Sequence, residues 1–466
     1  MSFEQRRLWF LSELDGAVAY NIPLALRLTG PIDDEALRTA LADVADRHEV
    51  LRTVFPAADG GGYQQVLTGP AARPELRIVA TDPDRLAADL AAAADEPFRL
   101  THELPIRAWL FGLGPQDHVL LLVVHHIACD EWSLEPMLRD LADAYEARRR
   151  GAVPNLPVPP VQYADYALWQ RDMLGREDDP ASLAARQSDF WRRTLAGIPA
   201  QLPLPFDRPR QVDAAPVAGI VWFAIPAPAA SALATVARAG DATLYMALQA
   251  AVAVVLSRSG AGDDIPLGTA TYGRPDEALD GLVGFFAKTV VLRTDLAGEP
   301  TFAELLQRVR ETDLAAFANQ DVPFESLVEA LNPERLPGVN PLFQVSVSMQ
   351  TGGWTGLELA GVEAAWQDAG PGLAPFDLSF VFDQPGPHST DGAADSPAAP
   401  ITASLRYRAD LFDQATAEDL ADRVVRVIEQ VGAARGPRSA DSPSWRPRSG
   451  TGCWSGGTPR PDPCRE

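Results

Sequence analysis

An uninterrupted apolar run, Val119 to Val124, leads directly into the stretch His125-His126-Ile127-Ala128-Cys129-Asp130-Glu131-Trp132-Ser133. The run is too short to span a membrane and is typical of a strand buried on both faces. Ser133, followed by Glu135 and Pro136, predicts the N-cap of a helix. Two imidazoles and a carboxylate therefore follow the end of a buried strand, where folds often place chemistry.

This stretch admits four interpretations. A metal site needs three or four converging ligands, whereas adjacent residues on a strand point to opposite faces, so only one of His125 and His126 can converge with Asp130. A Cys129 thiol activated by His126 is chemically conceivable, but nothing marks Cys129 as more than a small residue in a tight turn. The histidines could be hydrogen-bonded core residues. We favour the fourth interpretation, one imidazole acting in acyl transfer while Asp130 holds the loop, because Asp130 and the helix start crowd into the same few residues.

Composition excludes several classes of protein. With 46% apolar and 22% charged residues, the 466-residue chain is typical of a globular protein with two or three domains. Its formal charge of −23 argues against a nucleic-acid partner. We expect no membrane span and no signal peptide, and three scattered cysteines form no disulfide framework, so a cytoplasmic location fits best.

The order of predicted elements gives an α/β (α+β) fold in two halves. Strands and helices alternate through both, and the polar stretch 175–187 is the best boundary. We predict one lobe at 1–176 and a second at 177–434. From 435 to 466 the chain has no periodicity and few aliphatic residues, so we expect a disordered tail that reads like an out-of-frame translation of GC-rich DNA.

The stretch His-His-x-x-x-Asp-x-Trp-Ser resembles the core motif of condensation domains of nonribosomal peptide synthetases. Six further segments resemble motifs of that family in the same order, over residues 2 to about 430. They are 2–11, 47–55 (Arg-His-Glu-Val-Leu-Arg-Thr-Val-Phe), 163–169 (Tyr-Ala-Asp-Tyr-Ala-Leu-Trp), 283–289 (Val-Gly-Phe-Phe-Ala-Lys-Thr), 320–325 (Gln-Asp-Val-Pro-Phe-Glu) and 340–343 (Asn-Pro-Leu-Phe).

The resemblance implies two chloramphenicol-acetyltransferase-like lobes in a V-shaped pseudo-dimer with an active-site tunnel between them. It implies that an acceptor α-amine attacks a donor thioester, with both substrates on phosphopantetheine arms of peptidyl carrier domains supplied by an adenylation domain. The chain itself would bind no cofactor and no metal, and we expect a monomer. The stretch Tyr20-Asn21-Ile22-Pro23 resembles the subtype that accepts an L-configured donor.

By position, the resemblance makes His126 the catalytic residue and pairs Asp130 with Arg274 across the lobes. The supporting residues of the motif are His125, Asp130, Glu131, Trp132, Ser133 and Arg274. The candidates for the tunnel wall and lobe interface are Gly284, Phe286, Lys288, Asn319, Gln320 and Asp321.

Two positions depart from the family pattern. Glu131 stands where glycine is usual, and Lys288, the only lysine of the chain, stands where asparagine is common. A carboxylate at 131 would narrow the channel or bind an amine, and we hypothesise that it pairs with Lys288. Two other functions stay open: an acyltransferase that uses acyl-CoA, and a non-catalytic carrier-docking module left from a broken synthetase.

Overall fold

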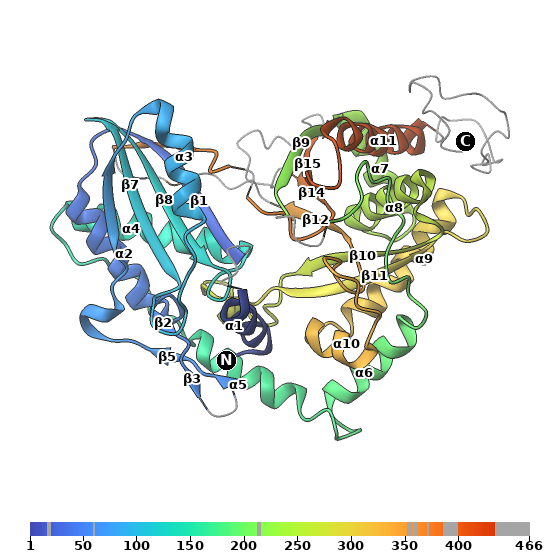
Figure 1. Ribbon diagram of the computed structural model, residues 1–466, viewed down its shortest axis with the longest axis horizontal. Helices are drawn as coiled ribbons and strands as arrows, with labels where there is room; N and C mark the ends of the chain where they lie inside the picture. The colour runs from blue at the N-terminus through green and yellow to red at the C-terminus, as the bar shows by residue number, and fades with distance from the viewer. Residues whose placement is uncertain are drawn as a thin grey trace, which may run out of the picture.

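The computed structural model describes residues 1–15, 20–58, 61–211, 216–351, 357, 359, 361–370, 372–384 and 399–433. These residues form two lobes that lie side by side and meet near the middle of the molecule (Figure 1). The expected disordered tail at 435–466 lies outside the described residues.

The N-terminal lobe is built on a five-stranded sheet in the order β13-β1-β8-β7-β6. Its central strand is the apolar run of the sequence, which pairs with antiparallel neighbours on both sides and is buried over most of its length. The strands of the sheet are β1 (Asn21–Thr29), β6 (Leu76–Ala80), β7 (Ile106–Gly114), β8 (Asp117–His125) and β13 (Glu363–Trp366).

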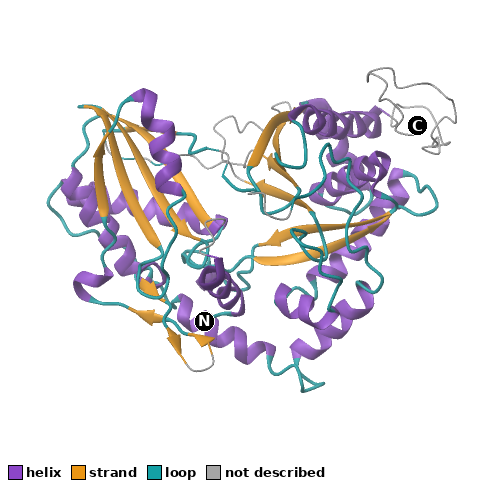
Figure 2. Cartoon of the chain, viewed as in Figure 1, coloured by secondary structure: helices purple, strands orange, loops and turns teal. Residues whose placement is uncertain are grey.

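Helices pack around this sheet, with α2 lying against α4. Figure 2 shows the helices and strands of both lobes. The helices of this part of the chain are α1 (Phe3–Asp15), α2 (Asp34–Arg47), α3 (Pro83–Ala94), α4 (Leu134–Arg149) and α5 (Tyr163–Leu174). Two short ribbons accompany them, β2 (Thr53–Val54) with β5 (Gln65–Val66) and β3 (Ala57–Ala58) with β4 (Gly61–Gly62).

The C-terminal lobe has a six-stranded sheet in the order β11-β10-β12-β14-β15-β9. Its strands are β9 (Ala218–Ile225), β10 (Asp264–Thr271), β11 (Lys288–Asp295), β12 (Val345–Thr351), β14 (Leu378–Gln384) and β15 (Ile401–Arg408). Its helices are α6 (Leu183–Thr194), α7 (Ala227–Ala239), α8 (Leu244–Leu256), α9 (Phe302–Phe317), α10 (Phe324–Leu331) and α11 (Gln414–Ala433).

Helix α8 of the C-terminal lobe is apolar on nearly all sides. The segment Leu244–Ala261 is long and apolar enough to cross a membrane, with a mean hydropathy of 1.3. However, 67% of it is buried inside the protein, because α8 packs between α7, α9 and α11. A core helix that is apolar on all sides passes the same test as a membrane span.

Two segments from the second half of the chain lie on the N-terminal lobe. Strand β13 pairs antiparallel with β1 and completes that sheet at its edge. The segment around Leu282, Val283 and Phe286 packs into the core of the same lobe. The division at residue 176 stays a prediction, and these two crossings tie the lobes together whatever its position.

Candidate active site

His125 and His126 occupy different environments, as the alternation of side chains along a strand requires. His125 is the last residue of β8 and is 1% exposed, with its ring edge against Phe98 at 5.8 Å between centroids. Its Nδ1 accepts a hydrogen bond from the backbone N–H of Ile127 at 3.1 Å. Burial, together with the nearby His126 and Arg107, lowers the pKa of His125 to about 3, so this ring is a neutral core residue.

His126 lies at the contact between the lobes. Its backbone N–H donates to the carbonyl of Tyr20 at 2.8 Å, just before β1 begins. The ring is partly exposed and rests on Phe285, which belongs to the second half of the chain, at 4.5 Å between centroids. Its Nδ1 is enclosed and has no hydrogen-bond partner, so Nε2 is the nitrogen through which the ring can reach a substrate. Burial lowers the pKa of His126, which keeps the imidazole neutral at neutral pH.

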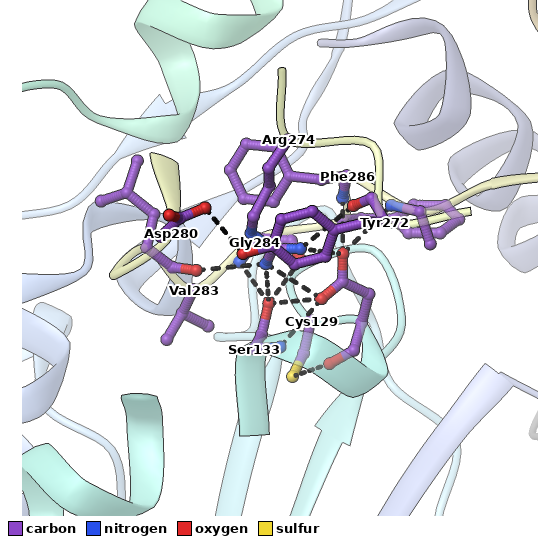
Figure 3. A network of polar contacts seen from close by, with 12 residues as sticks. Cys129, Ser133, Tyr272, Arg274, Asp280, Val283, Gly284 and Phe286 are labelled. Atoms are coloured by element: carbon purple, nitrogen blue, oxygen red, sulfur yellow. Dashed lines mark hydrogen bonds and ion pairs between the residues drawn. The ribbon is translucent and has the colours of Figure 1, made fainter. Parts of the chain in front are cut away.

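The Asp130 carboxylate is saturated by donors and makes no hydrogen bond to His126. Figure 3 shows Ser133, Arg274, Gly284 and Phe286 converging in one network of polar contacts. The expected ion pair with Arg274 is present, and both side chains are fully buried. Other donors come from the second half of the chain and from the following helical turn. The donors are Arg274 Nη1 (3.1 Å) and Nη2 (3.0 Å), Phe286 N (2.9 Å), Ala287 N (3.0 Å), Ser133 N (2.9 Å) and Ser133 Oγ (2.7 Å).

Ser133 is the N-cap residue of α4, as predicted, but its side chain makes no capping hydrogen bond to the first turn of that helix. Asp130 caps the 3₁₀ turn at Glu131–Ser133 that precedes α4, because its side chain accepts a hydrogen bond from Ser133 N. The Ser133 hydroxyl also contacts Gly284, whose N–H donates to it at 3.0 Å and whose carbonyl lies 2.8 Å away. The same hydroxyl accepts a hydrogen bond from Arg274 Nη2 at 2.8 Å.

Two glycines allow this close approach of the chain segments. A Cβ atom on Gly284 would lie 2.2 Å from the Tyr163 ring and 2.6 Å from the Phe286 ring. A Cβ on Gly273 would lie 1.9 Å from the carbonyl oxygen of Phe286, and Gly273 has a φ of +67°. The Arg274 guanidinium in turn lies over the Phe286 ring, 4.2 Å from its centroid. These contacts fix the turn that carries Arg274 against the motif of the other lobe.

Glu131 is an exposed residue at the start of the 3₁₀ turn that follows Asp130. Burial of its surroundings, followed by the charges of Asp383 on β14 and of Asp130, raises the pKa of Glu131 to about 7. Next to it, Trp132 packs edge-on against Tyr272 of the C-terminal lobe at 5.8 Å between centroids. Residues before and after Asp130 therefore contact the second half of the chain: His126 contacts Phe285, and Trp132 contacts Tyr272.

The hypothesis of a Glu131–Lys288 ion pair is wrong. Lys288 Nζ lies 2.6 Å from Asp321 Oδ1, and Asp321 also accepts from Gln187 Nε2 at 3.0 Å. Lys288 begins β11, whose course is set by pairing with β10, and this brings its side chain to the segment after α9. Asn319 is a structural residue of that segment, since its Nδ2 donates to Ala315 O at 2.9 Å and its own carbonyl accepts from Trp191.

The thiol of Cys129 is not available as a nucleophile. Cys129 is fully buried and its Sγ lies 3.3 Å from the carbonyl of Asp130. Burial raises the pKa of Cys129 well above its ordinary value, which disfavours the reactive thiolate. Among the residues that the structure describes, no three His, Cys, Asp or Glu side chains converge in a group that could hold a metal ion.

Comparison with known proteins identifies the family. A family model of the condensation domain matches residues 1–441, so the chain belongs to the condensation-domain family. The chain is 48% identical over 430 residues to CymA of Salinispora arenicola, a probable nonribosomal peptide synthetase, and 46% identical over 430 residues to the dimodular nonribosomal peptide synthase of Bacillus subtilis. Each match covers 92% of this chain but only 5% and 18% of those proteins, so the chain spans a small part of their length.

Solved structures agree on the fold. The X-domain from teicoplanin biosynthesis superposes with a TM-score of 0.86 at 36% identity, covering 94% of this chain and 96% of that one. The first condensation domain of the calcium-dependent antibiotic synthetase, in complex with a substrate analogue, superposes with a TM-score of 0.72 at 19% identity, covering 93% and 96%. The fold is therefore the chloramphenicol-acetyltransferase-like fold that the sequence predicted.

Three residues of the site were not singled out from the sequence. Phe285 supports the His126 ring, and the Tyr163 hydroxyl donates to the carbonyl of Phe285 at 2.6 Å. Both lie inside segments that resemble family motifs. Asp383 had no sequence signal, because it meets Glu131 only through the folding of β14.

Proposed function

We propose that this chain joins a donor acyl or peptidyl thioester to the α-amine of an acceptor aminoacyl thioester, with His126 acting on the amine. Condensation domains of nonribosomal peptide synthetases are amide-forming acyltransferases, and they bind no cofactor themselves. In this proposal both substrates arrive on phosphopantetheine arms of carrier domains, which work with adenylation domains of one assembly line. The observation that carries the proposal is the neutral His126 ring, partly exposed at the contact between the lobes.

The amine nitrogen attacks the donor carbonyl carbon, the new C–N bond forms, and the C–S bond to the donor arm breaks. The proton that the amine loses passes to the departing sulfur, which leaves as a thiol. An α-amine has a pKa of about 8, so a fair fraction is neutral before reaction, and the proton acceptor is needed as the C–N bond forms. A neutral imidazole with Nε2 available suits this role.

Asp130 and Arg274 are structural residues in this proposal. The carboxylate is fully occupied by six donors, so it has no lone pair directed at His126 and cannot relay its proton. Its function would be to hold the 126–133 loop against the Gly284 segment, which places Phe285 under the imidazole. Positioning of two tethered reactants supplies a further part of the rate.

A docking module without catalysis is the second candidate. It is favoured by the similarity to the X-domain, which has also been solved as a complex with OxyB from teicoplanin biosynthesis. That chain is 36% identical to this one and superposes with a TM-score of 0.84. In this alternative, the surface of the chain would recruit a partner protein and the buried network around Asp130 would serve stability only.

One experiment separates these functions. The purified chain is incubated with a donor carrier and an acceptor carrier, each loaded with an aminoacyl thioester, and the acceptor arm is weighed by mass spectrometry. A dipeptidyl arm supports condensation, and acylation from acyl-CoA alone supports the free acyltransferase. Binding of carriers or partner without product supports docking and would overturn the proposal. The cytoplasmic location, the monomeric state and the L-donor preference stay predictions.

A further inference from the structure

A cavity of about 350 Å³ opens on the C-terminal lobe beside the Arg274 turn. Tyr272 and Arg274 line one part of it, and Lys288, Phe317, Gln320 and Asp321 line the rest, together with Thr271. Ligand pockets commonly range from about 300 to 1,000 Å³, so this cavity has the size for one small group. The sequence singled out several of these residues, but the proposed chemistry at His126 does not use the cavity.

The cavity adjoins the proposed active site on two sides. Tyr272 packs against Trp132, which lies six positions after His126 in the chain. Lys288 lines this cavity and also a smaller one that Phe285 lines, and Phe285 is the residue on which the His126 ring rests. These shared residues connect the lining of the cavity with the surroundings of His126.

The charged groups of the cavity already have partners. Arg274 is neutralised by Asp130 in a fully buried ion pair. Lys288, whose side chain is 8% exposed, is neutralised by Asp321 at 2.6 Å. A charged ligand group would have to compete with one of these pairs and leave a charge unpaired, which is costly in a buried site. The cavity therefore disfavours both carboxylate and ammonium groups.

Two neutral polar groups are available instead. The Thr271 hydroxyl is buried and has no hydrogen-bond partner. The Gln320 side chain lines the cavity, and no hydrogen bond links it to another part of the chain that the structure describes. A hydroxyl and a primary amide each offer both a donor and an acceptor. Together with the rings of Phe317 and Tyr272, they match a ligand that is itself a neutral amide on a short apolar stem.

We propose that this cavity, the Thr271–Gln320 pocket, binds the neutral amide side chain of a carrier-bound aminoacyl substrate. The proposal rests on the proposed function, because it gives a substrate class to that reaction. Glutamine and asparagine are the amino acids with this chemistry. The pantetheine arm also carries amides, so the experiment must tell a side-chain amide from an amide of the arm.

Binding calorimetry on the purified chain tests the pocket without any turnover. The probes are three aminoacyl-pantetheine amides, in which nitrogen replaces the thioester sulfur, carrying glutaminyl, leucyl or glutamyl groups. We expect the glutaminyl probe to bind about tenfold more tightly than the other two, since the leucyl probe leaves polar groups unpaired and the glutamyl probe brings a charge. Equal affinity for the three probes would overturn the proposal.

Two variants and a matched control locate the effect. Gln320→Leu and Thr271→Val each remove a polar group at nearly constant volume, and we expect either change to reduce the glutaminyl preference to about twofold or less. Thr312→Val makes the same chemical change on α9 at a hydroxyl that bonds Arg308 O, outside the cavity lining, and should leave the preference unchanged. Thermal melting of each variant checks that it is folded. If one variant does not fold, the other still tests the pocket.

The combined results of the binding and carrier assays distinguish failure of the pocket from failure of the catalytic proposal. If both variants weaken all three probes equally, the pocket holds an amide of the pantetheine arm and the side-chain assignment is wrong. If the preference is present but the carrier assay gives no dipeptidyl arm, the pocket is supported and the catalytic proposal fails. If the dipeptidyl arm forms but neither variant alters the preference among probes, catalysis is supported and the pocket fails.

Discussion

Asp130 and Arg274 are 144 positions apart in the sequence, and their side chains meet at 3.0 Å with no exposure to solvent. The pair joins the loop after β8 to the turn after β10, so it connects the sheets of the two lobes. Around it, the backbone of residues 284–287 contributes further hydrogen bonds to the same carboxylate and to Ser133. Asp130 is therefore the carboxylate on which these hydrogen bonds between the lobes converge.

Removal of that carboxylate should destabilise the fold. We expect Asp130→Ala to lower the free energy of unfolding by about 3–5 kcal/mol, because the Arg274 charge stays buried without a partner. Urea denaturation followed by tryptophan fluorescence measures this. The matched control is Asp117→Ala, which breaks an exposed pair with Arg27 and should cost less than about 1 kcal/mol. Similar losses in the two variants would show that the buried pair is not a structural tie.

Replacement of the catalytic imidazole should affect rate more than stability. We expect His126→Ala to slow formation of the dipeptidyl arm by about 10²–10⁴-fold, the usual contribution of general base catalysis. The melting temperature should change little, because the ring is only partly buried and its Nδ1 bonds nothing. His102→Ala, at an exposed loop histidine, is the control and should retain full activity. A His126→Ala variant with unaltered rate would remove His126 from the mechanism.

The close packing of Gly284 against the Tyr163 ring can be tested by adding one methyl group at position 284. We expect Gly284→Ala to destabilise the protein by about 1–3 kcal/mol, since its Cβ would lie 2.2 Å from the Tyr163 ring and force the segment away. Gly281→Ala is the control three residues earlier, where an added Cβ meets nothing within 4 Å. The two free energies of unfolding are compared in urea. Equal effects would show that the close packing at Gly284 is unimportant.

The partner of Lys288 can be established by double-mutant cycles. For Lys288→Met with Asp321→Asn we expect a coupling energy of at least about 0.5 kcal/mol, because the two groups are in contact at 2.6 Å. For Lys288→Met with Glu131→Gln the effects should add within about 0.3–0.5 kcal/mol. Both cycles are calculated from free energies of unfolding of the single and double variants, measured at the same ionic strength. The reverse ranking would restore the pairing inferred from sequence.

The raised pKa of Glu131 predicts a pH-dependent stability. Its pKa is about 7 in the fold and 4.5 ordinarily, so the unfolded chain loses this proton first as pH rises. The favourable contribution of protonated Glu131 to the free energy of unfolding is complete below pH 4.5. It is lost as the pH rises through about 7. Glu131→Gln should therefore raise the melting temperature at pH 8 and leave it unchanged at pH 4.

A second variant tests the cause of that shift. Asp383 contributes a like charge, so in an Asp383→Asn background the gain from Glu131→Gln at pH 8 should be smaller. Melting curves of the four proteins at both pH values complete the comparison. A gain that is the same at pH 4 and pH 8 would contradict the assigned pKa.

The sequence alone determined the local features of the site. The apolar run 119–124 predicted a buried strand, and the alternation of side chains predicted that His125 and His126 face opposite sides of it. The structure places His125 in the core. The spacing of segments resembling family motifs predicted the fold and the Asp130–Arg274 pair. These predictions were possible because they depend on short-range periodicity or on matched motifs.

Only the tertiary structure decided which distant groups share an environment. It paired Lys288 with Asp321 instead of Glu131, inserted a 3₁₀ turn capped by Asp130 ahead of α4, and placed Phe285 under His126. It also brought β13 to the edge of the N-terminal sheet. The physical reason is that ion pairs, caps and ring contacts depend on distances of a few ångströms between segments that are far apart in sequence, and those distances are set by sheet pairing and packing of the whole chain.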